Sequence, residues 1–225
     1  IDTSTLKAED GLMQGNTRTW NGSGVPKLEN LKPGESGKVQ FSVRLKDPAV
    51  KDSSENIFVN SLAKVKSNEN QTFLNGNELS LKVSSPSKIE PSLVNISGPV
   101  PLKVGESTVM QVAVALRNSS NDLREGVLIG YIPLGVTFDK ASVSSAEAAA
   151  VKYDAATGKL TWTVGQLSAH SGSVNPLRTL KFNVKVTPSG TQVGQAIVVF
   201  KTVSLSAKDT FTEQPITLTT QEIST

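Results

Sequence analysis

Two segments of this 225-residue chain carry the same pattern of residues. In each segment, a Trp on a predicted short strand is followed by a polar turn that opens with Leu, and then by a run of alternating apolar residues. The segments span residues 17–46 and 159–186; Trp20 lies 21 positions before Phe41, and Trp162 lies 20 positions before Phe182. A module that recurs in this way predicts an array of similar β units.

The spacing of the apolar residues indicates strands rather than helices. In residues 38–46 the apolar side chains fall at every second position, and residues 180–187 repeat this alternation. Period two with one polar face is typical of an antiparallel sheet that is solvated on one side. We therefore predict an all-β fold of antiparallel β-sandwiches. Two cores are expected, one containing Trp20, Val39, Phe41 and Val43 and the other containing Trp162, Leu180, Phe182 and Val184.

A short stretch rich in Ser and Pro interrupts the strand pattern once, near residue 86. Such a stretch between two β segments is typical of a semi-rigid linker, so we predict a linker at residues 86–90 and a complete sandwich at residues 91–225. Only 19 residues precede Trp20, whereas 75 residues lie between Pro86 and Trp162. Residues 1–85 are therefore predicted to be the C-terminal part of a sandwich that is incomplete on its N-terminal side.

The residue types needed for catalysis are scarce. The chain has no Cys, which excludes disulfides, thiolate zinc sites and cysteine nucleophiles, and it has a single His. One imidazole cannot form a triad or a zinc site without partners, and His170 lies in a polar turn, so we predict an exposed loop residue. We assign no catalytic, cofactor-binding or metal-binding residues and predict that the chain is not an enzyme.

Three acidic clusters could offer oxygen ligands to calcium. They lie at Glu9 and Asp10, at residues 52–55, and at Asn121 and Asp122. None has the alternating spacing of a dedicated calcium loop, so we interpret them as solvated turns. Structural calcium remains the alternative, with Glu9, Asp10, Asp52 and Asp122 as its first candidate ligands.

Charge and hydropathy indicate neither nucleic-acid binding nor a membrane span. The net charge is only +3, the lysines are spread along the chain, and aromatic residues make up 5%; a nucleic-acid surface needs clustered basic residues interleaved with aromatics. No apolar run approaches the ~20 residues that cross a bilayer. Four tripeptides fit the N-glycosylation pattern and weakly indicate surface loops, at Asn21, Asn70, Asn95 and Asn118.

Short motifs in residues 91–225 are similar to those of a known repeat. An Asn-containing turn, a Pro-x-Gly-x-x-Phe-like stretch, a Trp followed by Leu and Gly, and a long alternating strand occur at Asn118, Pro133, Gly135, Phe138, Trp162, Leu167, Gly172, Leu180 and Val184. This pattern resembles the immunoglobulin-like repeat of bacterial and archaeal cell-surface proteins that is called domain of unknown function eleven. The first segment matches only the back half of the repeat, at Trp20, Leu31, Pro33, Gly34, Glu35 and Phe41. His170, Ser171 and Ile132 depart from the usual residues of the repeat.

The resemblance implies tandem immunoglobulin-like sandwiches in a long extracellular protein, without catalytic residues. It leaves two functions open. The first is a structural segment of a cell-surface stalk or filament, and the second is an adhesive module that recognises a glycan or a partner protein through loops at one end of the sandwich. Neighbouring repeats, or other copies of the chain that complete residues 1–85 by strand complementation, are the expected partners.

Overall fold

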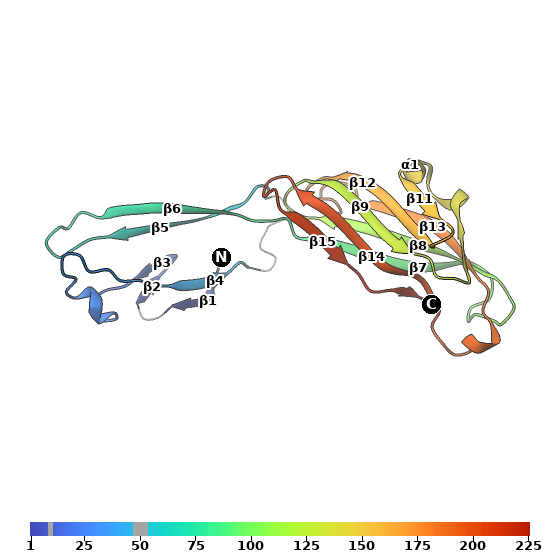
Figure 1. The fold of residues 1–225 in the computed structure, drawn as a ribbon, viewed down its shortest axis with the longest axis horizontal. Helices are drawn as coiled ribbons and strands as arrows, with labels where there is room; N and C mark the ends of the chain where they lie inside the picture. The colour runs from blue at the N-terminus through green and yellow to red at the C-terminus, as the bar shows by residue number, and fades with distance from the viewer. Residues whose placement is uncertain (9–10, 47–53) are drawn as a thin grey trace. The chain divides into compact units, whose positions relative to one another are not determined.

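Antiparallel strands make up most of the computed structural model, which describes residues 1–8, 11–46 and 54–225. The predicted all-β class is confirmed. The chain divides into two compact units, residues 1–51 and residues 52–225. The larger unit contains a β-sandwich of two layers (Figure 1).

One layer of the sandwich is a four-stranded sheet and the other is a six-stranded sheet. The first has the order β10-β13-β8-β7, with bounds β7 (Ser87–Ser97), β8 (Thr108–Asn118), β10 (Val136–Asp139) and β13 (Arg178–Val186). The second has the order β11-β12-β9-β14-β15, and β16 also pairs with β14. Its strands are β9 (Leu123–Tyr131), β11 (Val151–Asp154), β12 (Lys159–Leu167), β14 (Val198–Asp209), β15 (Pro215–Thr219) and β16 (Ile223–Ser224). Three short helices lie in its loops, η2 (Lys140–Ser142), α1 (Ser145–Ala148) and η3 (Gly190–Gln192).

The core lies between these two sheets, as the alternation predicts. Side chains at every second position of β8 and β13 point inward and are buried, while the positions between them are more exposed. The four residues predicted for this core, Trp162, Leu180, Phe182 and Val184, are fully buried. Phe182 makes edge-to-face contacts with Phe138 and Phe200, at ring-centroid distances of 5.5 and 5.4 Å. This core prediction is confirmed.

Gly130 allows one of these rings to approach the backbone of β9. The residue lies opposite Leu160 of β12 and is buried. A β-carbon added at Gly130 would lie 2.1 Å from Cζ of Phe200. The absence of a side chain at this position therefore makes room for the Phe200 ring.

The smaller unit is built of two-stranded sheets and has no buried residue among those described. Its strands are β1 (Asp2–Ala8), β2 (Leu12–Gln14), β3 (Thr17–Thr19) and β4 (Phe41–Arg44), with a short helix η1 (Pro26–Leu28). Trp20 packs against Phe41 at 6.2 Å, yet Phe41 is 48% exposed. The predicted core of Trp20, Val39, Phe41 and Val43 is therefore wrong within this unit, because two-stranded sheets have too little surface to cover one another.

A two-stranded hairpin precedes the sandwich in the larger unit. It consists of β5 (Phe58–Val65) and β6 (Leu74–Lys82), and it forms a sheet of its own. Leu79 and Leu81 lie on one face of β6 and are more than half exposed.

In the structure, residues 87–90 belong to strand β7 rather than to the predicted linker at residues 86–90. Ser87 to Glu90 form the beginning of β7 and pair with the end of β8, and Ser85 is buried. The compact units also separate at Lys51, well before this segment. The repeat limits at residues 1–85 and 91–225 remain predictions.

Candidate functional site

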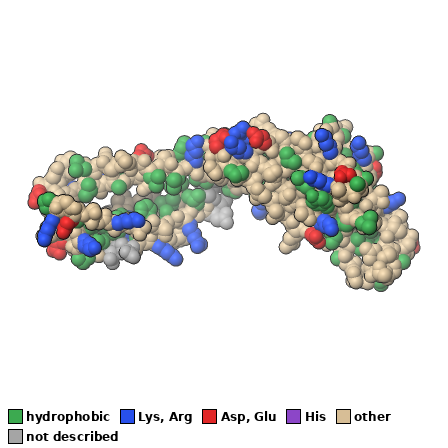
Figure 2. All heavy atoms as spheres, viewed as in Figure 1, with side chains coloured by type: hydrophobic (Ala, Val, Ile, Leu, Met, Phe, Trp, Pro, Cys, Tyr) green, Lys and Arg blue, Asp and Glu red, His purple; other side chains and the backbone are tan. Residues whose placement is uncertain are grey.

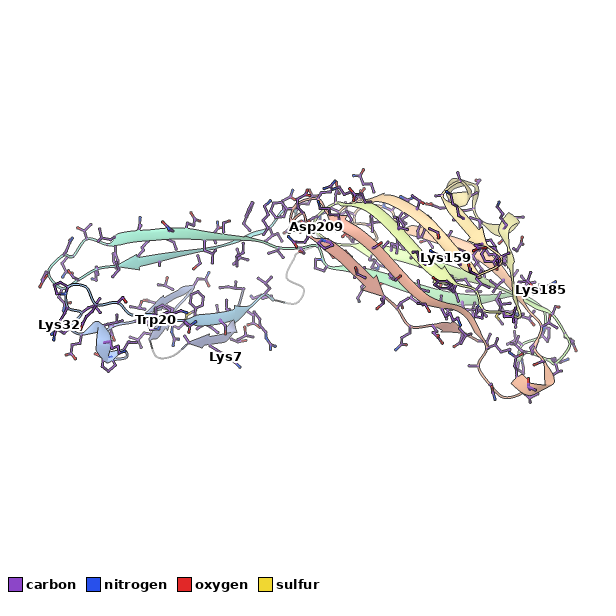
Figure 3. All side chains as sticks on the ribbon, viewed as in Figure 1. Lys7, Trp20, Lys32, Lys159, Lys185 and Asp209 are labelled. Carbon is purple, nitrogen blue, oxygen red and sulfur yellow. The ribbon has the colours of Figure 1, made fainter. Side chains whose placement is uncertain are left out.

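Buried polar side chains gather at one end of the sandwich, where the chain passes from the hairpin into β7. Antiparallel pairing brings the start of β7, the β8–β9 turn and the end of β14 to this end. Four side chains meet there, and we call them the polar clasp: Ser85, Asn118, Asn121 and Asp209. Each is less than 7% exposed. Figure 3 labels Asp209 at this end of the sandwich.

Asp209 is the charged member of the polar clasp. One carboxylate oxygen accepts hydrogen bonds from the backbone N–H of Ser85 and from the side-chain amide of Asn121, both at 2.8 Å. The other accepts from the backbone N–H groups of Phe211 and Thr212, both at 2.9 Å. Burial raises the pKa of Asp209, but these hydrogen bonds outweigh burial and hold the pKa below its ordinary value. The carboxylate therefore stays ionised while bound by neutral donors.

Ser85 and Asn118 connect Asp209 to the β8–β9 turn. The Ser85 hydroxyl donates to Oδ1 of Asn118 at 2.6 Å and accepts from the N–H groups of Ser120 and Asn121, at 2.9 and 3.3 Å. The Asn118 amide donates to the carbonyl oxygens of Asn121 and Ser168, at 2.7 and 3.0 Å. Each group has at least one partner, which stabilises a buried network and fixes its geometry.

Asn121 extends the polar clasp to both legs of the hairpin. Its amide N–H₂ donates to the carbonyl oxygen of Val83 at 2.9 Å, and its Oδ1 accepts from the N–H of Asn56 at 3.2 Å. Lys82 adds a hydrogen bond to the carbonyl oxygen of Phe211 at 2.8 Å. The residues before β5 and after β6 are thus held at the same end of the sandwich.

This arrangement holds the chain rather than providing reactive groups. The carboxylate of Asp209 accepts four hydrogen bonds. Ser85 has a hydroxyl of the kind that serves as a nucleophile in enzymes, but this hydroxyl donates to an amide oxygen rather than to a base. The Asn118 side chain is also buried, so glycosylation of Asn118 is incompatible with the folded state. That part of the surface-loop interpretation is wrong.

His170 is buried next to the polar clasp, contrary to the prediction of an exposed loop residue. Its side chain is 7% exposed, and Nε2 lies 3.3 Å from Oε1 of Glu55. The backbone N–H of His170 donates to the carbonyl oxygen of Ser119 at 2.9 Å. The turn that contains His170 folds back against the β8–β9 turn, and this burial depends on packing that a polar local sequence does not reveal.

The structure does not test the calcium alternative, because it does not describe most of the candidate ligands. Glu9, Asp10 and Asp52 lie outside the described residues. Asp122 accepts a hydrogen bond from the N–H of Ala169 at 2.7 Å, which ties it to the same end of the sandwich. Among the residues that the structure describes, no group of three or more His, Asp or Glu side chains could hold a metal ion. The interpretation as solvated turns stays a prediction, with structural calcium as its alternative.

A second charged cluster ties helix α1 to one strand of each sheet, β12 and β13. Glu147 accepts a hydrogen bond from the Trp162 indole N–H at 2.7 Å and from two nitrogens of Arg178, both at 3.1 Å. The guanidinium of Arg178 also lies 5.6 Å from the Trp162 ring centroid. A bidentate ion pair with this geometry positions side chains strongly. Since both carboxylate oxygens are used, the cluster holds α1 in place.

The surface charges are mixed. Arg124 and Lys208 both contact Glu213, at 2.7 and 2.6 Å. These bonds lower the pKa of Glu213, the bond from Lys208 most. On the face drawn in Figure 2, acidic and basic side chains are interspersed, and neither sign forms a continuous area. Among the described residues, no helix combines the length and apolar character that crossing a bilayer requires.

Comparison with known proteins identifies distant structural neighbours only. No protein-family profile and no curated protein matches the chain. The major pilin subunit BcpA of Bacillus cereus is similar over 73% of this chain and 47% of its own, at 7% identity and a TM-score of 0.33. An exo-β-N-acetylglucosaminidase of Vibrio harveyi is similar over 58% of this chain and 17% of its own, at 12% identity and a TM-score of 0.34. This chain thus spans less than half of either neighbour, and similarity at this level assigns no function.

Proposed function

We propose that this chain is a non-catalytic structural segment of an extracellular cell-surface protein or filament. The observation that carries the proposal is the polar clasp, in which the best-buried ionised group of the sandwich binds backbone and amide donors instead of a reactive partner. An active site normally keeps a base, a nucleophile or an anion-binding group free for substrate. Here the buried polar groups connect the hairpin to the sandwich.

Exposed apolar side chains support association with neighbouring repeats or with other copies of the chain. Leu79 is 55% exposed and Leu81 is 53% exposed on one face of the hairpin. Isolated two-stranded sheets are marginally stable in water, and a folded protein rarely leaves such a face uncovered. Strand complementation of residues 1–85 would cover the apolar faces and would pair the free strand edges.

Two measurements test this proposal. Antibodies raised against the recombinant chain should label intact cells of the source organism as strongly as permeabilised cells; labelling that requires permeabilisation would contradict an extracellular location. The second is sedimentation equilibrium over a range of concentrations, where Leu81→Lys should weaken self-association. Ser80→Lys adds the same charge at the adjacent position, whose side chain points to the opposite face, and is the matched control. Equal effects of both substitutions would contradict the predicted use of the apolar face.

An adhesive module is the second candidate, favoured by the loops at the opposite end of the sandwich. Val100, Val104, Leu134 and Val193 lie in these loops and are each more than half exposed, with Leu134 fully exposed. Single exposed aliphatic residues are common on protein surfaces, which is why this function ranks second. Binding of the chain to a glycan array or to host-cell extracts that is lost in Leu134→Asp would favour it over the structural function.

A further inference from the structure

Two parts of the chain are attached to opposite ends of strand β14. One is the segment that enters the sandwich, and the other is the last residue described. At one end, the N–H of Ser85 donates to Asp209, the last residue of β14, at 2.8 Å. At the other end, Thr225 and Ile197 exchange two hydrogen bonds, of 3.1 and 3.0 Å, directly before β14 begins. β14 has 12 residues and is hydrogen-bonded to β9 on one side and to β15 on the other. Both attachments therefore act on a strand in the interior of a sheet.

Without the attachment at Ser85, tension on the preceding chain would act on a weak element. β7 is an edge strand, and among the described strands it is hydrogen-bonded only to β8. Its first pair is Ser87 with Asn118. Tension on residue 87 would therefore be carried by the hydrogen bonds between β7 and β8 alone, without support from a second neighbouring strand.

Ser85 lies two residues before this pair and is held more strongly. Its backbone N–H and its hydroxyl take part in four hydrogen bonds, with Asp209, Asn118, Ser120 and Asn121. Water has little access, since Ser85 is 6% exposed and Asp209 is fully buried. Hydrogen bonds in such surroundings resist exchange with solvent, and displacing Ser85 would leave several buried groups without partners.

We propose that the polar clasp is a mechanical stop that diverts tension from β7 to β14. Tension that reaches Ser85 passes to Asp209, runs along β14 and leaves at Ile197 and Thr225. Between these two attachments the covalent backbone of β14 carries the tension, so the hydrogen bonds between β7 and β8 are not loaded. The inference deepens the structural function proposed above and rests on it, because a segment of a stalk or filament carries load along the chain.

Single-molecule pulling with optical tweezers tests this proposal on the full chain. Peptide tags at the two ends supply handles for the first geometry. In the second geometry a thiol handle replaces the N-terminal tag at Ser92→Cys, a position in the middle of β7 that lies beyond the polar clasp and is exposed. The chain has no Cys, so this thiol is unique. We expect the sandwich to rupture at a higher force from the chain ends than from residue 92, and Ser92→Cys pulled from its ends should behave like the unaltered chain.

Two variants test the residues of the polar clasp. Ser85→Ala removes the hydroxyl contacts, and Asp209→Asn removes the charged acceptor. Pulled from the chain ends, each should show an additional early step in which residues 85–97 are released, adding about 45 Å of unfolded contour length at roughly 3.3–3.6 Å per residue. Asp154→Asn makes the same chemical change at an exposed turn carboxylate and should show no such step.

The outcomes separate a mechanical role from a general effect on stability. Equal rupture forces from the chain ends and from residue 92, in a chain that carries only Ser92→Cys, would overturn the proposal, and this comparison does not depend on whether either polar-clasp variant folds. A variant that lowers the rupture force equally in both geometries would also overturn it, since the polar clasp would then only stabilise the fold. Failure of the surface-labelling test would contradict the proposed function but would leave the pulling comparison unchanged.

Discussion

Gly130→Ala should destabilise the sandwich by overpacking its core. The added β-carbon would lie 2.1 Å from Cζ of Phe200 and 2.6 and 2.7 Å from the two ring carbons next to it, whereas unstrained carbon contacts are ~3.5–4.0 Å. Rotation of the ring about its own axis does not help, because Cζ lies on that axis. The ring is also held edge-to-face against Phe182 and is fully buried.

The magnitude follows from two opposing effects. Overpacking of a dense core costs about 1–3 kcal/mol, and the rigid ring places this substitution at the upper end. Alanine in a strand interior is better than glycine by roughly 0.5–1 kcal/mol. The clash outweighs this gain, so we expect a net loss of about 2 kcal/mol in the free energy of unfolding.

Urea unfolding followed by the fluorescence of Trp162, in a Trp20→Phe background, measures this loss. Gly190→Ala is the control, because a β-carbon there meets no atom within 4 Å and the change should stay within about 0.5 kcal/mol. Phe200→Leu should partly rescue Gly130→Ala, with the double variant at least about 1 kcal/mol more stable than the sum of the single effects. Strict additivity, or a loss below about 0.5 kcal/mol for Gly130→Ala, would refute the reasoning.

Four further predictions concern single groups. Phe182→Ala should cost about 3–5 kcal/mol in the same urea assay, and a cost under about 1 kcal/mol would contradict the packing of its ring. Ser120→Ala should raise the melting temperature, because the Ser120 hydroxyl is buried without a hydrogen-bond partner among the described residues; a lower melting temperature would show that this hydroxyl is bound. The pKa of Asp209 is lowered on folding, so its carboxylate stabilises the protein above the unfolded pKa of ~3.9 and this contribution is lost as the pH falls through the folded pKa. The difference in unfolding free energy between Asp209→Asn and the unaltered chain should therefore be constant at neutral pH and shrink in acid, and a difference that grows in acid would contradict this. Chelator should leave the melting temperature unchanged, while a clear drop would favour structural calcium, with Glu9, Asp10, Asp52 and Asp122 to be substituted first.

Alternation of apolar residues was sufficient to predict the inward faces of the sandwich strands. In a strand, successive side chains point to opposite faces, so the pattern at Leu180, Phe182 and Val184 defines one buried face without knowledge of the rest of the fold. The same pattern at Val39 and Phe41 failed within the smaller unit. Alternation predicts which side chains share a face, but burial of that face requires a second layer.

The polar clasp was not predictable from local sequence. Asn118 has the sequence pattern of a turn and of a glycosylation acceptor, and Asp209 carries no local signal, because its partners Ser85 and Asn121 lie 124 and 88 positions away. The burial of His170 is not evident from local sequence for the same reason, since its contacts with Glu55 and the β8–β9 turn join segments far apart in the chain.

The all-β class and the residues that face the core therefore follow from the sequence, since strand periodicity is a local property of the backbone. Tertiary structure decided the rest: which carboxylate is buried and ionised, which glycine admits an aromatic ring, and which apolar faces stay uncovered. Each of these depends on the approach of residues from separate strands, and short-range patterns hold no information about that approach.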